Sequence, residues 1–203
     1  QLLQFITPLV VVLTNLFRDQ LDRYGEVDVI AEKWVTALRQ LPKDTIVVIN
    51  ADDPQVAYLG KHILARTVYF GIDDQHFFLK DREHATDSIF CLNCGGRLMY
   101  KGIYYSHLGI WRCEMCAETR PQPLISTWES PLPGLYNLYN TLAAVTTAKM
   151  LGLSDKIINL ALSEFTPAFG RQEEFTVGTK HIKLFLSKNP AGIIKPSVLF
   201  IRK

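Results

Sequence analysis

Four cysteines place the strongest constraint on how this chain folds. They form two Cys-x-x-Cys pairs, Cys91/Cys94 and Cys113/Cys116, with 18 residues between the pairs. Two tight turns that each present two thiolates supply the four soft ligands of a tetrahedral zinc ion. In a 203-residue chain this spacing favours a metal over disulfides. The sequence therefore predicts a four-cysteine zinc ribbon, in which the closed ligand set gives the ion a structural role and no chemistry.

The residues between the two cysteine pairs are expected to form a hairpin. Apolar and aromatic stretches at 98–100 and 103–105 flank Lys101-Gly102, where we expect the turn. His107 is an alternative metal ligand by residue type, but four cysteines complete the set and we expect this histidine to be a bystander.

Before the ribbon, strand and helix patterns alternate. Asp53 followed by Pro54 indicates a helix start, and the run 10–13 is apolar enough for a strand that is buried on both faces. This alternation is typical of βαβ units, so we expect an α/β fold around a parallel sheet. The expected elements are strands at 10–13, 45–49 and 67–70, with helices at 27–41 and 55–64 between them.

After the ribbon, helical periodicity returns. Helices are expected at 138–148, with Asn137 as the cap, and at 154–165, and strands near 174–177 and 182–186. Hydrophobic residues make up 48% of the chain and charged residues 21%, which excludes a disordered protein. The formal net charge of +2 gives no strong basic field that would indicate nucleic acid or membrane as the main partner. No apolar run is long enough to span a bilayer, and no signal peptide is evident.

Several short motifs resemble those of the Mur ligase family, in the family's order. Residues 186–192 (LSKNPAG) are similar to the start of the C-terminal domain in MurT-type subunits of lipid II isoglutaminyl synthase, and a four-cysteine ribbon within the central domain is typical of that subgroup. The resemblance covers about residues 8–192. The other motifs are residues 14–26 (TNLFRDQLDRYGE), 50–54 (NADDP), 134–140 (GLYNLYN) and 170–173 (GRQE).

The resemblance implies a fold and a domain order. Residues 1–170 would form part of a Mur ligase central, ATP-binding domain with a P-loop-NTPase-like parallel sheet, and the zinc ribbon would be inserted at about 86–124. Residues 171–203 would begin the C-terminal domain. No Gly-x-x-x-x-Gly-Lys-[Ser/Thr] phosphate loop occurs, and the family resemblance ends after Gly192. We therefore expect a domain truncated at both ends, lacking its first strand and phosphate loop, and inactive alone.

The resemblance also implies a reaction. Mur ligases use ATP and Mg²⁺ to convert a carboxylate into an acyl phosphate, which an amine then attacks. A MurT-type enzyme would amidate the α-carboxyl of D-glutamate in lipid II to D-isoglutamine, during peptidoglycan synthesis. Its ammonia would come from a GatD-type glutaminase in a heterodimer, in the cytoplasm at the inner face of the membrane.

Three residues correspond to family site residues, and each has a plainer alternative. Asn140 matches the asparagine that pairs with adenine, although an asparagine near a helix start also serves as a cap. Arg171 matches the arginine that reaches the phosphates; the alternative is a surface arginine in a hinge. Lys188 falls where the family has a basic residue near the reacting phosphate, or is an exposed loop lysine. Asp52 and Asp53 are each either a residue of the ligand site or a helix cap.

The acidic residues Asp19, Asp22 and Glu26 are candidate ligands for magnesium, a hard cation that prefers carboxylate oxygens. The family usually has histidine where Gln20 stands, which weakens this interpretation.

A second hypothesis from a different class stays open. The chain is then a zinc-ribbon binding module that contacts protein or nucleic acid, with ribbon aromatics stacking on bases next to cations. The same aromatics also suit the small core of the ribbon itself. The residues concerned are Tyr100, Tyr104, Tyr105 and Trp111, with Arg97, Lys101 and Arg112.

Overall fold

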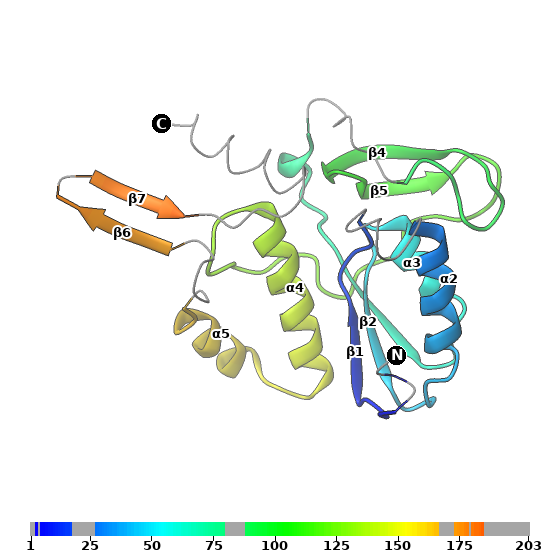
Figure 1. Cartoon of the computed structure of the whole chain (residues 1–203), viewed down its shortest axis with the longest axis horizontal. Helices are drawn as coiled ribbons and strands as arrows, with labels where there is room; N and C mark the ends of the chain where they lie inside the picture. Colours follow the sequence, from blue (N-terminus) through cyan, green and yellow to red (C-terminus); the bar gives the residue numbers. More distant parts are fainter. Residues whose placement is uncertain are drawn as a thin grey trace.

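The computed structural model describes residues 3, 5–17, 27–79, 88–166, 173–178 and 180–184. A parallel sheet, an antiparallel hairpin and helices on both sides of the sheet make up this part of the chain (Figure 1). The elements in order are β1 (Val10–Leu13), α2 (Val27–Leu38), β2 (Ile46–Asn50), α3 (Pro54–Gly60), β3 (Arg66–Phe70), the 3-10 turn η2 (Gln75–Phe77), β4 (Leu98–Tyr105), β5 (Leu108–Cys113), α4 (Leu135–Met150), α5 (Asp155–Ser163), β6 (Glu173–Val177) and β7 (Lys180–Leu184).

The expected parallel sheet is present, with the strand order β1-β2-β3. Alternate residues of β2 serve opposite faces, as a strand requires. Val47 and Ile49 pack with α2 and α3, whereas Val48 packs with Leu142 of α4 on the other face. Burial on both faces thus holds for β2 but not for β1, where Val12 is 40% exposed.

The segment that leaves the hairpin returns to the sheet beside β3. The amide of Leu124 donates to the carbonyl of Tyr69 (2.7 Å), and the amide of Gly71 donates to the carbonyl of Ile125 (3.2 Å). The ribbon is therefore an insertion that begins and ends next to the same strand.

The predicted turn at Lys101-Gly102 is wrong. β4 runs through both residues, and the turn lies at Ser106–His107, where Ser106 has a left-handed φ of 51°. Gly102 serves a close approach, since a Cβ there would lie 2.3 Å from the ring of Phe78. The strand register is irregular between Tyr100 and Gly102, which absorbs the extra residue in β4.

The residue that caps the helix was predicted correctly for α3 but not for α4. Asp53 caps α3 as expected, but that helix ends at Gly60 and not at residue 64. Asn137 is not the cap of α4: Gly134 takes that position with a φ of 100°. The side chain of Asn137 instead donates from Nδ2 to the carbonyl of Pro133 at 2.7 Å.

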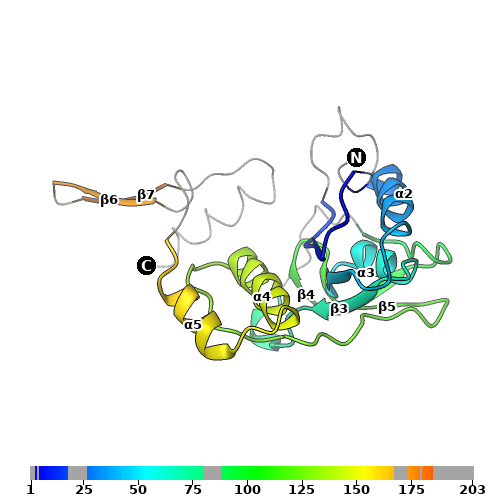
Figure 2. The ribbon, with the colours of Figure 1, turned by 90° about the horizontal axis from the view of Figure 1, so that it is seen from below.

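At the C-terminal side, β6 and β7 pair as an antiparallel hairpin. The hairpin lies beyond α5 and away from the parallel sheet (Figures 1 and 2). The predicted domain joint at residue 170 lies outside the described residues, so the division at 170/171 stays a prediction. Among the described helices, none combines the length and apolar character needed to cross a bilayer.

Candidate functional site

The four cysteines come together at the end of the ribbon that lies away from its turn. Their sulfur atoms all lie within 4.8 Å of one another, with Cys94–Cys113 at 3.5 Å and Cys91–Cys116 at 3.8 Å. Four thiol sulfurs this close together match the donor set of a tetrahedral zinc ion. Gly95 has a φ of 73°, the left-handed backbone expected in the first Cys-x-x-Cys turn.

Backbone amides donate hydrogen bonds to two of these sulfurs. The amides of Met115 and Cys116 each donate to Cys113 Sγ at 3.4 Å, and the Gly96 amide donates to Cys94 Sγ at the same distance. Burial opposes ionisation of the Cys113 thiol, but its hydrogen bonds outweigh burial and lower the pKa to about 7. A thiolate near neutral pH is the form that binds metal.

His107 lies at the opposite end of the hairpin and has no part in the cysteine cluster. Its ring is wholly buried, and Nε2 lies 3.3 Å from Oδ2 of Asp53. Phe17, just after β1, packs against this ring with centroids 4.8 Å apart and meets Tyr105 edge-on at 5.8 Å. The ribbon turn therefore packs directly against the α/β domain.

Asp53 joins three parts of the chain. Its Oδ1 accepts hydrogen bonds from the amides of Gln55 (2.9 Å) and Val56 (3.2 Å), which caps α3. Its Oδ2 accepts one from the amide of Leu16 at 2.7 Å and faces His107. One carboxylate thus links the start of α3, the segment after β1 and the ribbon turn.

Asp52 is the second wholly buried carboxylate of this loop. Its Oδ2 accepts from the amide of Ile72 (2.8 Å) and the hydroxyl of Tyr139 (2.7 Å), while Oδ1 accepts from Nε of Arg120 at 2.6 Å. Arg120 also donates from Nη1 to Asp73 at 2.8 Å. Burial raises the pKa of Asp52 to about 6, although Arg120 and the hydrogen bonds draw it down. The pair fastens the segment after the ribbon to β2, β3 and α4.

Two further hydrogen bonds connect β5 with the same loop. The amide of Gly109 donates to the Asp52 carbonyl (2.9 Å), and Nε1 of Trp111 donates to the Ala51 carbonyl (3.0 Å). Residues 50–54 follow the carboxyl end of β2, the edge at which open parallel sheets bind ligands. The ribbon therefore holds the loop at the carboxyl edge of the sheet.

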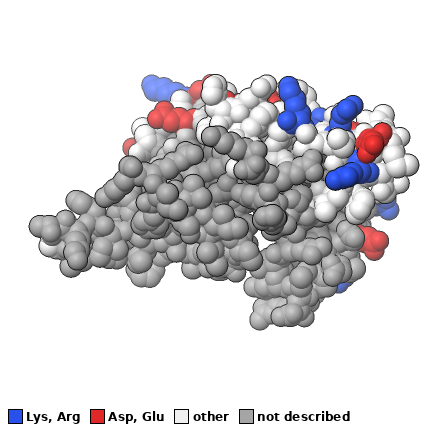
Figure 3. Space-filling view, turned by 90° about the horizontal axis from the view of Figure 1, so that it is seen from above, with Lys and Arg blue, Asp and Glu red and all other residues white. Residues whose placement is uncertain are grey.

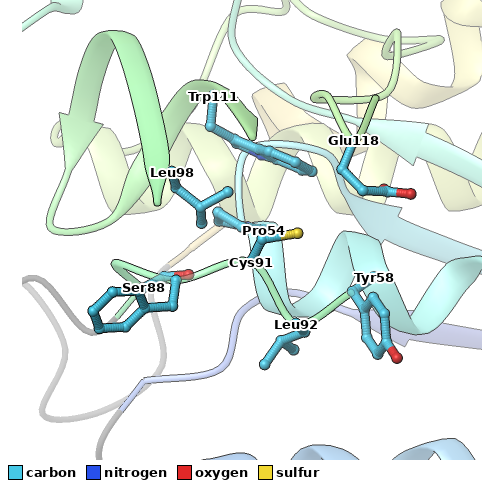
Figure 4. A pocket seen from close by; sticks show the side chains of 9 residues that line it. Pro54, Tyr58, Ser88, Cys91, Leu92, Leu98, Trp111 and Glu118 are labelled. Carbon is cyan, nitrogen blue, oxygen red and sulfur yellow. The ribbon is translucent and has the colours of Figure 1, made fainter. Parts of the chain in front are cut away.

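A small groove separates the ribbon from α3 (Figure 4). Pro54 and Tyr58 line it from α3, and Leu98 and Trp111 line it from the hairpin. Its enclosed space is about 10 Å³, which is room for about one water molecule and not for a nucleotide.

Of the three residues predicted for the ATP site, the structure describes Asn140 alone. Asn140 lies exposed on α4, whereas Arg171 and Lys188 lie outside the described residues, as do the acidic residues of 18–26. That these groups meet around ATP stays a prediction.

Sequence reasoning missed Arg120 and Tyr139 as partners of Asp52. Tyr139 lies inside the motif 134–140, which was a usable signal. Arg120 is 68 residues from Asp52 and had no local signal.

The comparisons with known proteins agree on one family. A family model described as the Mur ligase middle domain matches residues 1–148. The MurT subunit of lipid II isoglutaminyl synthase (glutamine-hydrolyzing) from Streptococcus pneumoniae is 34% identical over 93% of this chain and 46% of its own length. The MurT subunit from Staphylococcus aureus is 31% identical over 95% of this chain and 47% of its own length. The chain thus spans about half the length of these relatives.

Solved structures give the same architecture. A pseudomurein peptide ligase type C from Methanothermus fervidus superposes with a TM-score of 0.75 at 29% identity, over 94% of this chain and 41% of that one. MurF from Acinetobacter baumannii superposes with a TM-score of 0.64 over 99% of this chain and 39% of that one, and at 16% identity it supports the fold alone.

Proposed function

Because the chain belongs to the Mur ligase middle-domain family, we propose that it works within an ATP-dependent carbon–nitrogen ligase of peptidoglycan synthesis. The observation that carries this proposal is the 34% identity to a MurT subunit across 93% of the chain. The proposed reaction amidates the α-carboxyl of D-glutamate in lipid II and gives D-isoglutamine.

The reaction needs two transfers. The γ-phosphoryl group of ATP passes to a carboxylate oxygen and leaves ADP, and ammonia then attacks the acyl phosphate and expels inorganic phosphate to form the amide. Transfer of this kind depends on positioning and on cations more than on covalent help from the protein. We assign Asn140 to the adenine, Arg171 to the phosphates and Lys188 to the region of the reacting phosphate. The exposure of Asn140 on α4 supports its assignment.

ATP and Mg²⁺ supply the phosphoryl group and the charge that neutralises it. The residues for Mg²⁺ are not assigned within the described part of the chain. We expect the 203 residues alone to bind ATP weakly, because their sequence holds no phosphate-loop motif.

The proposed partner is a GatD-type glutaminase that forms a heterodimer and delivers ammonia. Support comes from the name of the MurT relatives, which describes a glutamine-hydrolyzing enzyme with subunits. The proposed location is the cytoplasm, at the inner face of the membrane where lipid II is amidated.

Zinc is proposed as a structural ion held by the four cysteines. The mutual distances of their sulfurs and the amide hydrogen bonds to Cys94 and Cys113 support this assignment. With four thiolates the ion has no open position, so it would stabilise the ribbon and take no part in amide formation.

The base-stacking alternative loses its main support. Tyr104 and Trp111 are 0% and 4% exposed, so these aromatics form the interior of the ribbon and its contact with the sheet. They do not form a platform for bases.

The decisive test uses the full-length ligase subunit together with its glutaminase. We expect ATP-dependent amidation of lipid II with glutamine, and with ammonium chloride when the glutaminase is left out. Arg171→Lys keeps the charge but loses the two-pronged geometry, and should lower kcat by about tenfold or more. Asn140→Ala should mainly raise the KM for ATP. Absence of lipid II amidation with either nitrogen source would overturn the proposal.

A further inference from the structure

The four cysteines of the ribbon are close enough to react with one another, and the chain has no others. Two sulfur contacts, Cys94–Cys113 at 3.5 Å and Cys91–Cys116 at 3.8 Å, each join one Cys-x-x-Cys turn to the other. A disulfide bond is about 2.05 Å long, so sulfur movements of less than about 2 Å would close either bond. The arrangement that suits a zinc ion therefore also suits two disulfides between the turns.

Each of these pairs combines a more open thiol with a buried one. Cys94 is exposed and its neighbour Cys113 is buried, while Cys116 is half-buried and its neighbour Cys91 is buried. A reagent from solvent therefore meets Cys94 first. The buried sulfur of Cys113 is then in reach of the atom that has been modified.

The backbone of the first turn favours bonds between the turns over bonds within them. The amide of Gly95 donates to the carbonyl of Cys91, and the amide of Cys91 donates to the carbonyl of Gly96, both at 2.8 Å. A bond between Cys91 and Cys94 would have to form inside this hydrogen-bonded turn. A bond to the other turn leaves both hydrogen bonds in place.

The surroundings of the cluster favour a small uncharged reagent. The cysteine end of the ribbon lies at the right of Figure 1, where β5 ends. At the same end of the upper face, Figure 3 shows Lys and Arg side chains with acidic groups among them. Charges of both signs give no field that would concentrate one kind of ion there. Hydrogen peroxide, which is neutral and small, fits this surface.

We propose that the cysteine cluster is a site of reversible oxidation by hydrogen peroxide, which forms two disulfides and releases the zinc. One bond joins Cys94 to Cys113, and the other joins Cys91 to Cys116. The release of zinc rests on the structural ion proposed above. The pairing of the cysteines rests on the sulfur contacts and on the backbone of the turn.

The chemistry needs two molecules of peroxide for each chain. A metal-bound cysteine is a thiolate, the form that reacts. The sulfur of Cys94 attacks one peroxide oxygen, the O–O bond breaks and hydroxide leaves, which gives a sulfenic acid. The Cys113 thiolate attacks that sulfur, so that the S–S bond forms, the S–O bond breaks and a second hydroxide leaves. The peroxide has accepted two electrons, and both hydroxides take protons from the buffer. A second peroxide oxidises Cys116 and Cys91 in the same way.

Oxidation would exchange a metal for two covalent links in the same place. Cys91 and Cys94 precede β4, and Cys113 is the last residue of β5, so both disulfides would tie the end of one strand to the end of the other. We therefore expect the hairpin to stay paired after the zinc has left. Its contacts with the loop 50–54 would then persist under oxidising conditions.

The test treats the zinc-loaded 203-residue chain with hydrogen peroxide, without ATP or substrate. A colorimetric chelator follows zinc release, and dimedone traps the sulfenic acid that forms first. Chymotrypsin cuts after Leu92 and a glutamate-specific protease cuts after Glu114, which separates all four cysteines for mass spectrometry without reduction. We expect the first dimedone label on Cys94, followed by the two disulfides between the turns. Dithiothreitol with added zinc should restore the starting form.

A pair of matched variants tests the pairing without any metal. Cys91→Ser with Cys116→Ser keeps one pair between the turns, whereas Cys113→Ser with Cys116→Ser keeps the pair within the first turn. We expect peroxide to form the disulfide at least about tenfold faster in the first variant. Met115→Leu, which removes an exposed oxidisable side chain next to the cluster, should release zinc within about twofold of the unmodified rate.

Several results would overturn the proposal. They are disulfides within the turns, equal rates in the two double variants, and zinc that stays bound while only methionine is oxidised. Loss of amide protection in β4 and β5 after oxidation would also overturn it, because the disulfides would then not replace the metal. A chain purified without chelator that holds no zinc contradicts the zinc assignment alone, since the pairing is still read from the peptides.

Discussion

The two ends of the β4–β5 hairpin are held by different forces. At the turn, Tyr104, His107 and Leu108 are buried against the sheet and α4, and hydrogen bonds reach the loop 50–54. At the cysteine end, Cys94 and Met115 are exposed, and the buried cluster is small, consisting of Ala57, Cys91, Leu98, Trp111 and Cys113. The zinc ion proposed for the cysteine end would add stability where packing is limited, whereas at the turn the core of the domain supplies it.

The two ends of the hairpin therefore hold different parts of the molecule in place. The turn end fixes Asp52, Asp53 and, through Phe17, the segment that precedes residues 18–26. At the cysteine end, a zinc ion bound as proposed would keep the ends of β4 and β5 paired. Damage at one end should therefore leave a different signature from damage at the other.

The largest effect is expected from metal loss. Cys91→Ser removes one of four thiolates and should release the zinc, since structural zinc contributes on the order of 10 kcal/mol to small zinc domains. We expect rapid hydrogen exchange in β4 and β5 and slow exchange retained in β2 and β3, measured by mass spectrometry next to metal analysis. Protein purified without chelator that carries no zinc would contradict this prediction. Met115→Ala, which changes an exposed residue between Cys113 and Cys116, is the control.

The next effect concerns the buried ion pair at the other end. Arg120→Ala leaves the Asp52 carboxylate buried without its guanidinium partner, which typically costs about 3–5 kcal/mol. The loss should be largest at about pH 8 and smaller at about pH 5, where Asp52 takes up a proton. Urea unfolding at both pH values measures it, with Arg112→Ala as an exposed control. An equal loss at the two pH values would show that Arg120 contributes by packing alone.

Local signals account for what the sequence revealed. A buried strand is predicted by the apolar run Val47, Val48 and Ile49 alone. The start of α3 is predicted by two adjacent residues, Asp53 and Pro54. The cysteine spacing likewise indicates the cluster without help from the rest of the chain.

Contacts between distant residues account for what stayed hidden. The hairpin turn was misplaced because Gly102 is required by the ring of Phe78, which packs across it from another segment. The Arg120–Asp52 pair joins residues that no sequence window contains together. Positions of Arg171 and Lys188 remain predictions from family motifs.

A smaller effect should appear in the pH dependence of stability. The pKa of Asp52 is raised from 3.8 to about 6, so the folded state holds this proton more tightly than the unfolded chain. Stability from this group is complete below about pH 4 and is lost as the pH rises through about 6, by up to about 3 kcal/mol. Asp52→Asn should flatten this slope in unfolding measured from about pH 4 to about pH 7. The exposed carboxylate variant Asp155→Asn should keep it; a flattened slope there instead would point to general charge effects.

The smallest global effect is expected at His107, where the change should be mainly local. Neither ring nitrogen has a hydrogen-bond partner among the described residues, although Nε2 lies 3.3 Å from Oδ2 of Asp53. His107→Phe loses that contact but also removes two buried polar nitrogens, so the two terms offset and the free energy of unfolding should change by less than about 1 kcal/mol.

The local consequence falls on the amide of Leu16, which donates to the same Oδ2 atom of Asp53. Without the histidine the carboxylate is held less firmly, and exchange of the Leu16 amide should quicken by roughly five- to tenfold, a local cost of about 1 kcal/mol. His107→Gln, which keeps a nitrogen donor, should restore part of the protection. Tyr100→Phe, toward the cysteine end of β4, should leave Leu16 unaffected. If the Leu16 amide exchanges at the same rate in His107→Phe and in the unmodified chain, then the ribbon turn packs on the domain without positioning Asp53 or the segment that follows β1.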